Sequence, residues 1–574
     1  MLVERERVGN DSRGGGHAPG PPIHEIYGIN AVPSVSVLDG LVQVGWQGSQ
    51  GGLAVAGELD GSTVSRDVYT KYYDEETCEI RVESSVTLED FEAVTPPEDW
   101  QRLDEYVEAN KDKEIVFINA TPRGGGVAIM RGPLVHLLTL KGMNVRWFAL
   151  EPDEEASKVT KWKFHNVMQD VAEPEVRLSD EDIDHKYDPW MGRNAKKLKA
   201  PLKTADIIVI DDWQPSGLIP YIKGDTRVTP DGTEYQDGFN PDATILFRDH
   251  IHTEGRLMVT PGTPQYDTWQ FLWEDNRINE SDVFITHPKD EFVPPNVPNE
   301  KVVFMPATGD RLDDLNRDIT EEEKRAGLEF IDEALVNNEN QEPLDLARPY
   351  IVLIARFDES KGMPQGIESY AKARQKLIDQ GVRKEDLPQF VVVGNGSVDD
   401  PSGKPMLEKI MRIRSEKHGD IKDDLKVVRL AHNDIAINAL LKGAKLALQP
   451  STKEGFESRV TDAILQGVPV LGSDRGGIPL QIIEGQSGHV IAPDDTNKWA
   501  GRIAELMTNT EKYEAMVEST KELAETYNYS FTTIPNAIRW LWLSQHAHSD
   551  FQGNRLWVDE HIAGSEVSQE PVEA

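Results

Sequence analysis

The sequence predicts an α/β protein made of two Rossmann-like, doubly wound domains that follow an N-terminal β-rich extension. Three observations support this fold class. The chain has 574 residues, which is too many for one hydrophobic core. Two separate series of short apolar runs alternate with helical patterns, one starting near residue 114 and the other near residue 349. Before them, apolar and polar residues alternate with the period of antiparallel strands.

The first 95 residues differ in composition from the rest of the chain. Residues 1–22 are rich in glycine, proline and charge, and we expect a disordered lead there. Residues 23–95 contain alternating stretches such as V-P-S-V-S-V-L-D-G-L-V-Q-V-G-W, in which Asp-Gly favours a tight turn. This β-rich extension is also a candidate interface for a homodimer.

Residues 96–320 have the pattern of a first Rossmann-like domain. The run E-I-V-F-I-N-A predicts a buried strand, T-P-R-G-G-G a turn, and the following apolar segment a helix that ends at Gly142. Further strands are expected at N-V-R-W-F-A-L, A-D-I-I-V-I-D-D, A-T-I-L-F-R-D-H, S-D-V-F-I-T-H and K-V-V-F-M-P-A.

Residues 321–535 repeat this pattern and predict a second Rossmann-like domain. Its strands are expected at P-Y-I-V-L-I-A-R-F, Q-F-V-V-V-G-N-G, L-K-V-V-R-L, K-L-A-L-Q-P and V-P-V-L-G. The helical segment 536–562 includes I-R-W-L-W-L, which is apolar enough to pack across both domains. Residues 563–574 are polar and predict a flexible tail.

Composition excludes several classes of partner. The net charge of −38 at pH 7 disfavours nucleic acid and anionic membranes. No apolar run reaches the roughly 18 residues of a membrane span, and the N-terminus lacks the apolar core of a signal peptide. The single cysteine, Cys78, excludes internal disulfides and cysteine-rich zinc sites. We therefore expect a cytoplasmic protein that acts on small molecules.

Gly124, Gly125 and Gly126 lie between a predicted strand and the start of a helix. Glycines at this place let backbone N–H groups approach an anion such as phosphate, although the triplet could also be a simple tight turn. The spacing matches neither G-x-G-x-x-G nor a Walker A loop, so a nicotinamide cofactor is not favoured.

Two cations, Arg356 and Lys361, follow a predicted strand in A-R-F-D-E-S-K-G. A guanidinium can hold two phosphate oxygens at once, and an ammonium adds a movable point charge. The pair therefore suits a phosphate that must be held as a leaving group. The alternative is surface ion pairing with Asp358 or Glu359.

Polar residues also follow strands of the first domain. His250 and His252 form an H-x-H pair, but no third ligand is evident, so a metal site is not expected. We favour a hydrogen bond between a histidine and a sugar hydroxyl, with ordinary packing as the alternative. Asp211 and Asp212 end another strand, where they could accept hydrogen bonds from hydroxyls.

The stretch 450–479 places Glu454 in a polar turn after an apolar strand, and Asp462 eight residues later on a helix. Gly476 and Gly477 lie in its closing turn. Ligands of open α/β sheets bind at the carboxyl ends of strands, so we expect a sugar site here. The acid pair of a glycoside hydrolase is disfavoured, because the two acids lie along one helix rather than across a bond. Asp462 is either a ligand acceptor or an ordinary helix residue.

Together these motifs resemble the retaining glycosyltransferases of family 4, whose signature is a Glu, seven residues and a second Glu. Here the signature stands as E-G-F-E-S-R-V-T-D, with Asp462 in the second place. More narrowly, stretches such as T-P-R-G-G-G-V-A-I-M-R, D-D-W-Q-P-S-G-L-I-P and A-R-F-D-E-S-K-G-M-P resemble the fungal trehalose phosphorylases and the trehalose synthases of the clock-controlled gene-9 type. The resemblance covers most of residues 114–500 and implies the two-Rossmann GT-B fold.

The resemblance also implies a mechanism and a set of site residues. Glucose would be transferred with retention in the cleft between the domains, without a protein nucleophile, a metal or a cofactor. Its co-substrate would be inorganic phosphate or a nucleoside diphosphate sugar. Catalytic roles are implied for four residues: Arg356, Lys361, Glu454 and His250. Substrate-binding roles are implied for seven more: Gly125, Gly126, Asp212, Gln214, Asp462, Gly476 and Gly477.

The implied activity is conversion of trehalose and phosphate into glucose and α-glucose 1-phosphate. A nucleotide-sugar-dependent trehalose synthase and a catalytically silent sugar-binding protein are the alternatives. The resemblance assigns the second acid of the signature to a nucleotide ribose. The shorter Asp462 therefore favours inorganic phosphate. We expect Lys361→Ala to lower turnover and to leave the fold intact.

Overall fold

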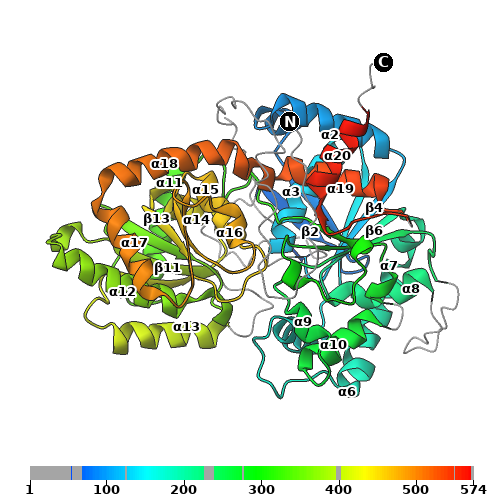
Figure 1. The fold of residues 1–574 in the computed structure, drawn as a ribbon, viewed down its shortest axis with the longest axis horizontal. Helices are drawn as coiled ribbons and strands as arrows, with labels where there is room; N and C mark the ends of the chain where they lie inside the picture. Colours follow the sequence, from blue (N-terminus) through cyan, green and yellow to red (C-terminus); the bar gives the residue numbers. More distant parts are fainter. Residues whose placement is uncertain are drawn as a thin grey trace, which may run out of the picture.

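The computed structural model describes residues 53–54, 68–122, 126–224, 238–274, 277–395, 403–548 and 550–569. They form two α/β domains that lie side by side, the first on the right and the second on the left of Figure 1. Each domain has one sheet with a parallel core and helices packed against it. The predicted fold class of two Rossmann-like domains in the GT-B arrangement is confirmed.

Within the described residues, the first sheet contains ten strands. In spatial order they are β1 (Leu53–Ala54), β2 (Tyr69–Tyr73), β3 (Glu79–Ser84), β5 (Asn144–Ala149), β4 (Glu114–Asn119), β6 (Ile207–Asp211), β7 (Thr244–Arg248), β8 (Val283–Thr286), β9 (Val302–Phe304) and β16 (Leu556–Trp557). The strands from β5 to β16 are parallel. Their apolar runs are buried, as expected for strands covered by helices on both faces.

The second sheet is wholly parallel. Its order is β12 (Leu425–Leu430), β11 (Gln389–Asn395), β10 (Tyr350–Ile354), β13 (Leu446–Gln449), β14 (Val470–Ser473) and β15 (Gly488–Ile491). The winding direction reverses between β10 and β13, as it does between β4 and β6 in the first sheet. Such switch points open a crevice at the carboxyl ends of the strands, so each domain offers one ligand crevice.

Helices cover both sheets. Those of the first domain are α1 (Leu88–Ala93), α2 (Pro97–Asn110), α3 (Gly126–Leu140), α4 (Glu154–Val159), α5 (Asn166–Met168), α6 (Asp180–Asp182), α7 (Asp188–Thr204), α8 (Ile219–Lys223), α9 (Gly255–Met258) and α10 (Pro264–Trp273). Those of the second are α11 (Glu321–Asn337), α12 (Met363–Asp379), α13 (Gly403–Arg412), α14 (Asp434–Gly443), α15 (Ser458–Leu465), α16 (Ile478–Gln481), α17 (Thr496–Thr508) and α18 (Thr510–Glu525). Gly142 follows α3 with φ +80°, a conformation that favours glycine after a helix.

The described part of the expected β-rich extension belongs to the first domain. The hairpin β2–β3 joins the sheet through antiparallel pairing of β3 with β5. Its alternating residues Tyr69, Tyr73 and Ile80 are buried in the core of that domain. The expected extension also contains the helix α1. Residues 1–22, expected as a disordered lead, and most of residues 23–67 lie outside the described residues.

The C-terminal segment returns to the first domain. Figure 1 shows the chain leaving the second domain along α18 and ending in α19 (Thr533–His546) and α20 (Val558–Gln569) on the first. There α19 packs against α2 and α3, and Trp540 lies edge-on against Phe117 with ring centroids 5.3 Å apart. We had expected residues 536–562 to pack across both domains. They pack mainly on the first domain, and Trp557 also packs against a cluster that includes Phe456 of the second. The chain itself crosses between the domains at residues 527–531. Likewise α20 continues to Gln569, past the expected start of the tail.

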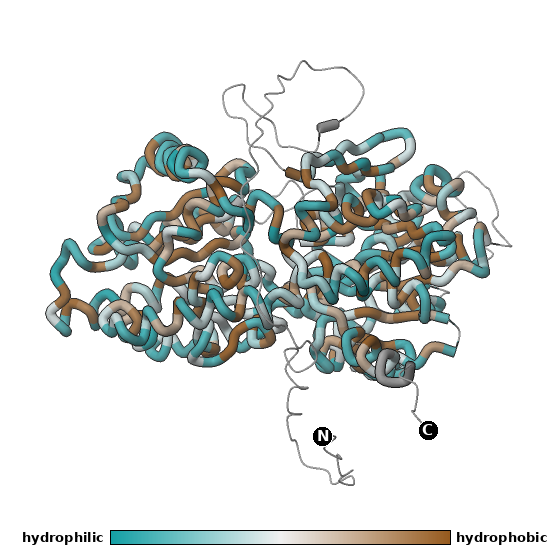
Figure 2. The backbone as a smooth tube through the Cα atoms, turned by 90° about the horizontal axis from the view of Figure 1, so that it is seen from above, coloured by the Kyte–Doolittle hydropathy of each residue, from teal (hydrophilic) through white to brown (hydrophobic). Residues whose placement is uncertain are grey.

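Hydropathy follows this architecture. In Figure 2 apolar segments concentrate inside each domain, and polar segments surround them. Within the described residues, no helix is both long and apolar enough to cross a bilayer.

Candidate active site

The wall of the site in the second domain is built at the switch point between β10 and β13. Lys361 ends a short 3-10 turn after β10, and Glu454 and Glu457 lie in the turn after β13. The Lys361 Nζ atom lies 2.5 Å from Glu454 Oε2 and 2.7 Å from Glu457 Oε2. Because β10 and β13 are parallel neighbours, these residues meet although more than 90 positions separate them in the chain.

A glycine allows this close approach. Gly362 follows Lys361 with φ +63°, and a Cβ atom there would lie 1.9 Å from the carbonyl oxygen of Pro450. A side chain at this position would collide with the backbone and would also strain the left-handed conformation. Gly362 therefore holds the Lys361 turn against the end of β13.

The two predicted cations differ in environment. Lys361 is nearly buried, with 11% of its side chain exposed, and it pairs with Glu454 and Glu457 rather than with Asp358 or Glu359. Arg356 is exposed on the same loop. Burial by itself would raise the pKa of Asp358. The positive charge of Arg356 is among the causes that outweigh burial and lower this pKa to about 2. Arg356 thus lies near Asp358, as the surface-pairing alternative supposed.

The opposite wall is formed by the first domain. His250 follows β7, and its Nε2 atom lies 2.8 Å from Asp211 Oδ1 at the end of β6. The other oxygen of Asp211 lies 2.6 Å from Arg131 on α3. Burial lowers the pKa of His250, which keeps the imidazole neutral. Since a carboxylate only accepts hydrogen bonds, Nε2 carries the proton and Nδ1 is the acceptor.

Asp212 and Gln214 are held in the turn after β6. Asp212 has φ +80°, accepts a hydrogen bond from Trp213 N at 3.0 Å, and lies 3.3 Å from His165 Nε2 through its other oxygen. Burial alone would raise the pKa of Asp212, but His165 lowers it. The amide oxygen of Gln214 is buried and has no hydrogen-bond partner within the described residues. An unused acceptor of this kind suits a ligand hydroxyl.

The two walls touch at Gly455, where a Cβ atom would lie 2.7 Å from the carbonyl oxygen of His250. His287 Nε2 donates to that same carbonyl at 3.1 Å. The His287 ring stacks on Phe456 with centroids 5.6 Å apart. Lys453 pairs with Glu254 across the same boundary. The predicted residues Glu454 and His250 thus face one interdomain contact, although they come from different domains.

His252 lies against a carboxylate of its own loop. Its Nε2 atom lies 2.9 Å from Glu254 Oε1. Across the described part of the chain, no group of three or more His, Cys, Asp or Glu side chains is placed to hold a metal ion.

The predicted glycines have different settings. Gly476, with φ +53°, packs on the backbone of Glu454, where a Cβ atom would lie 1.9 Å from the carbonyl oxygen. The Gly477 N–H donates to Gly455 O at 2.7 Å. Both glycines therefore support the turn that carries Glu454, and the N–H of Gly477 is already used. Gly126 begins α3 in open space, whereas Gly124 and Gly125 lie outside the described residues.

Asp462 lies on α15, buried against the linker between the domains. Its oxygens lie 2.8 Å from Arg459 Nη1 and 3.2 Å from Asn316 Nδ2. Burial raises the pKa of Asp462. In this conformation both carboxylate oxygens of Asp462 bind protein groups. This favours the alternative that Asp462 is an ordinary helix residue over direct contact with a ligand.

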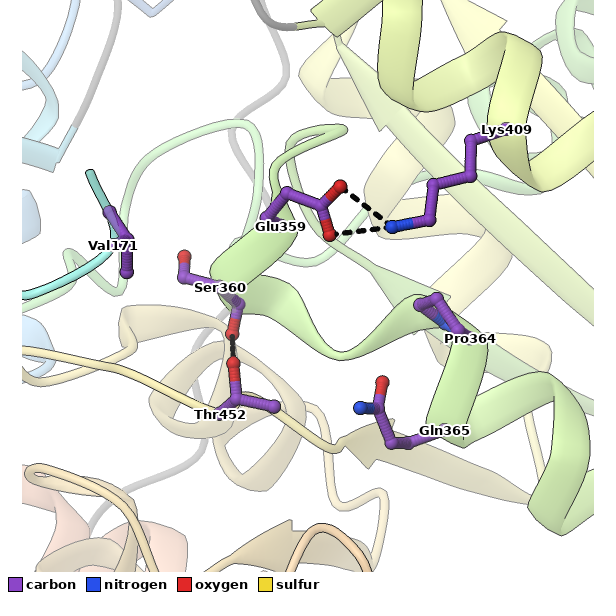
Figure 3. A pocket seen from close by; sticks show the side chains of 7 residues that line it. All are labelled: Val171, Glu359, Ser360, Pro364, Gln365, Lys409 and Thr452. Carbon is purple, nitrogen blue, oxygen red and sulfur yellow. Dashed lines mark hydrogen bonds and ion pairs between the residues drawn. The ribbon is translucent and has the colours of Figure 1, made fainter. Parts of the chain in front are cut away.

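A cavity of about 410 Å³ lies beside the Lys361 turn. Figure 3 shows Val171 of the first domain facing the second-domain residues Ser360 and Thr452. Glu359 and Lys409 pair at 2.7 Å on its rim. Ser360 and Thr452 belong to the two turns that carry Lys361 and Glu454. The cavity therefore adjoins the site on the side of these turns.

Three residues of the site were missed by sequence reasoning: Glu457, His287 and His165. Glu457 lies three positions after Glu454 in E-G-F-E, and this proximity is the one sequence signal that could have indicated it. His287 ends the predicted strand S-D-V-F-I-T-H, so its place at a strand end could have indicated it. His165 lies in a segment without a distinctive motif.

Comparisons with known proteins agree with this architecture. Residues 117–294 match the family model for the trehalose synthase N-terminal domain, and residues 337–523 match the model for glycosyl transferases group 1. The α,α-trehalose 6-phosphate synthase of Burkholderia multivorans has a similar fold, with a TM-score of 0.52 at 12% identity over 80% of this chain and 99% of that one.

Sequence relatives are closer. The trehalose phosphorylase of Grifola frondosa is 35% identical over 78% of this chain and 59% of its own length. The corresponding enzyme of Pleurotus pulmonarius is 34% identical over 82% of this chain and 63% of its own length. The chain thus spans about three fifths of these fungal relatives.

The archaeal relatives are matched over nearly their whole length. The trehalose synthase of Thermococcus litoralis is 30% identical over 76% of this chain and 92% of its own length. Because this relative is 30% identical and is matched over 92% of its length, and because the two halves of the chain match the two family models, the chain belongs to the glycosyltransferase family of the trehalose synthases and trehalose phosphorylases.

Proposed function

We propose that the chain is a retaining glucosyltransferase that converts trehalose and inorganic phosphate into glucose and α-glucose 1-phosphate, and that also runs the reverse reaction. The observation that carries this proposal is the meeting of the Lys361–Glu454 pair with His250 across the domain boundary at Gly455. A cation for phosphate and acceptors for hydroxyls then lie close to one domain boundary. The similarity to the fungal trehalose phosphorylases supports the same substrates.

The site residues would have different roles according to their chemistry. Lys361 and Arg356 would stabilise the phosphate, since both carry positive charge on one loop. Glu454 would accept hydrogen bonds from glucose hydroxyls, and Nδ1 of His250 would do the same from the first domain. Lys361, Glu454 and His250 are already oriented by ion pairs and hydrogen bonds, so catalysis would rest on electrostatic preorganisation around an oxocarbenium-like state.

The acceptor glucose would lie against the turn after β6. Asp212 presents a carboxylate there, and Gln214 presents an unused amide oxygen. Both groups accept hydrogen bonds, which is what sugar hydroxyls require. No cofactor is needed for this chemistry. We further propose that the protein acts in the cytoplasm, in keeping with its one cysteine.

The test is a phosphorolysis assay with the purified chain. Trehalose and inorganic phosphate should release α-glucose 1-phosphate and glucose in equal amounts. If release instead requires a nucleoside diphosphate, the chain is a nucleotide-sugar-dependent trehalose synthase. Trehalose binding by calorimetry without turnover under either condition would identify a sugar-binding protein.

A further inference from the structure

Glu457 has an unusual backbone for its residue type. It adopts φ +67° and ψ +79°, in the left-handed region that residues with a Cβ atom avoid. Its side chain is buried, and one of its oxygens caps α15 by accepting a hydrogen bond from Arg459 N at 3.3 Å. Glycine would suit this backbone better, so Glu457 places a carboxylate here against the local conformational preference. Such an outlier points to a function for the side chain.

The other oxygen of Glu457 competes for Lys361. An ammonium group has three donors, and in this site two of them point to carboxylates, those of Glu454 and Glu457. Two buried carboxylates share one cation, which leaves this group of three with a net negative charge. An anion that approaches Lys361 therefore meets a site that already carries excess negative charge.

The surrounding charges do not remove this excess. Arg459 lies beside Glu457, but it is paired with Asp462 at 2.8 Å. Arg356 lies near Lys361, but its charge also acts on Asp358.

On the first-domain side of this boundary, Lys161 lies 3.8 Å from the carboxylate of Asp358, which therefore takes part of its charge. Glu254 of the first domain pairs with Lys453 of the second. The ring of His287, packed on Phe456, is neutral because burial and the nearby Arg248 hold its pKa well below the usual value.

We propose that Glu457 couples anion binding at Lys361 to the uptake of one proton, so that the site takes phosphate together with a proton. This inference rests on the proposed function, because it takes phosphate as the anion. On binding, a phosphate oxygen accepts the hydrogen bond that Lys361 now donates to Glu454. An O–H bond forms on the released Glu454 carboxylate, with the proton supplied by a buffer acid in solution. The Glu457 carboxylate stays ionised on Lys361.

The pKa values of Glu454 and Glu457 agree with protonation of Glu454 while Glu457 stays ionised. Burial, together with the charge of Glu457, raises the pKa of Glu454 to about 7. Burial would also raise the pKa of Glu457, but the Lys361 charge lowers it. Glu454 is therefore the carboxylate poised to accept a proton near neutral pH. Binding of a further anion raises its pKa again, so uptake is largest somewhat above neutral pH.

The experiment is calorimetric titration of the full chain with inorganic phosphate at about pH 8, in two buffers with different ionisation enthalpies. The difference in heat gives the number of protons taken up. Wild type is compared with Glu457→Gln and with Glu457→Gly, which also relieves the left-handed backbone. Glu359→Gln is the matched control, since its carboxylate pairs with Lys409 on the neighbouring rim. Protonation of phosphate itself contributes to all four proteins.

We expect both Glu457 variants to take up about half a proton less than wild type and to bind phosphate about tenfold more tightly, because one buried negative charge is gone. Glu359→Gln should match wild type. If Glu457 only caps α15, its replacement should lower thermal stability without changing the number of protons taken up, and that result would also overturn the inference. Equal uptake by wild type and both Glu457 variants overturns the inference, even when the enzyme releases glucose 1-phosphate. Absence of both phosphate binding and glucose 1-phosphate release in wild type overturns the proposed function itself.

Discussion

Replacement of Lys361 by alanine should destabilise the second domain as well as lower turnover. The structure thus revises the expectation from sequence that this variant keeps its fold intact. Lys361 is the shared partner of Glu454 and Glu457, whose side chains are only 12% and 5% exposed. Removing one partner of a buried ion pair typically costs about 3–5 kcal/mol, because the remaining charge is left uncompensated.

The cost should depend on pH. Without Lys361, burial raises the pKa values of both carboxyl groups, so they become neutral as the pH falls. The loss of unfolding free energy should therefore be largest at about pH 8 and shrink toward about pH 5. Chemical denaturation at both pH values measures the loss directly. The double variant Lys361→Ala/Glu457→Gln should recover part of the stability, since one orphan charge is removed, but none of the activity.

The control is Lys453→Ala. Lys453 pairs with the partly exposed Glu254, so its removal should cost no more than about 1 kcal/mol. Turnover of Lys361→Ala in the phosphorolysis assay should fall by about 10²–10³-fold, the typical loss when one charge-stabilising donor is removed. If Lys361→Ala had the same unfolding free energy as wild type at about pH 8, the reasoning would be refuted. Such a result would show that the two buried carboxylates need no cation.

Three further predictions concern the supports of the site. Gly362→Ala should lower the unfolding free energy by more than about 2 kcal/mol, because its Cβ atom would collide with the backbone. Gly381 also has a left-handed φ of +84° but lies in open space, so Gly381→Ala should lower it by only about 1 kcal/mol. Similar thermal stabilities of the two variants would contradict this. Asp211→Asn should lower turnover through misplacement of His250, and an unchanged rate would exclude this anchor. The pKa of Asp358 is lowered to about 2, so its contribution to stability is complete above about pH 4 and is lost as the pH falls toward 2; acid denaturation of Asp358→Asn should lack this step.

Much of the fold could be predicted from local pattern. Runs such as I-V-F-I and Y-I-V-L-I are short, apolar and regularly separated by helical periods, and a parallel sheet covered on both faces is the arrangement that buries them. The places where these runs end also predict where polar site residues lie. Asp212, His250, Lys361 and Glu454 all follow strands, as expected.

Packing partners could not be predicted in the same way. The segment I-R-W-L-W-L is mostly apolar, which predicts that it is buried. The pattern does not tell which elements it packs against. In the structure α19 lies against α2 and α3 of the first domain, because the chain crosses back at residues 527–531. The hairpin β2–β3 likewise has a local pattern, and only pairing with β5 makes it part of the first sheet.

The sequence by itself determined the two-domain α/β class, the strand ends that carry the polar residues, and the motif that contains Glu454. Only the tertiary structure decided that Lys361 contacts both Glu454 and Glu457, since parallel neighbours β10 and β13 bring together residues far apart in the chain. It also decided that Glu457 has a left-handed backbone and that Asp462 is occupied by Asn316 and Arg459. The physical reason is that charge and periodicity are local properties, whereas ion pairing and burial depend on which strands lie side by side.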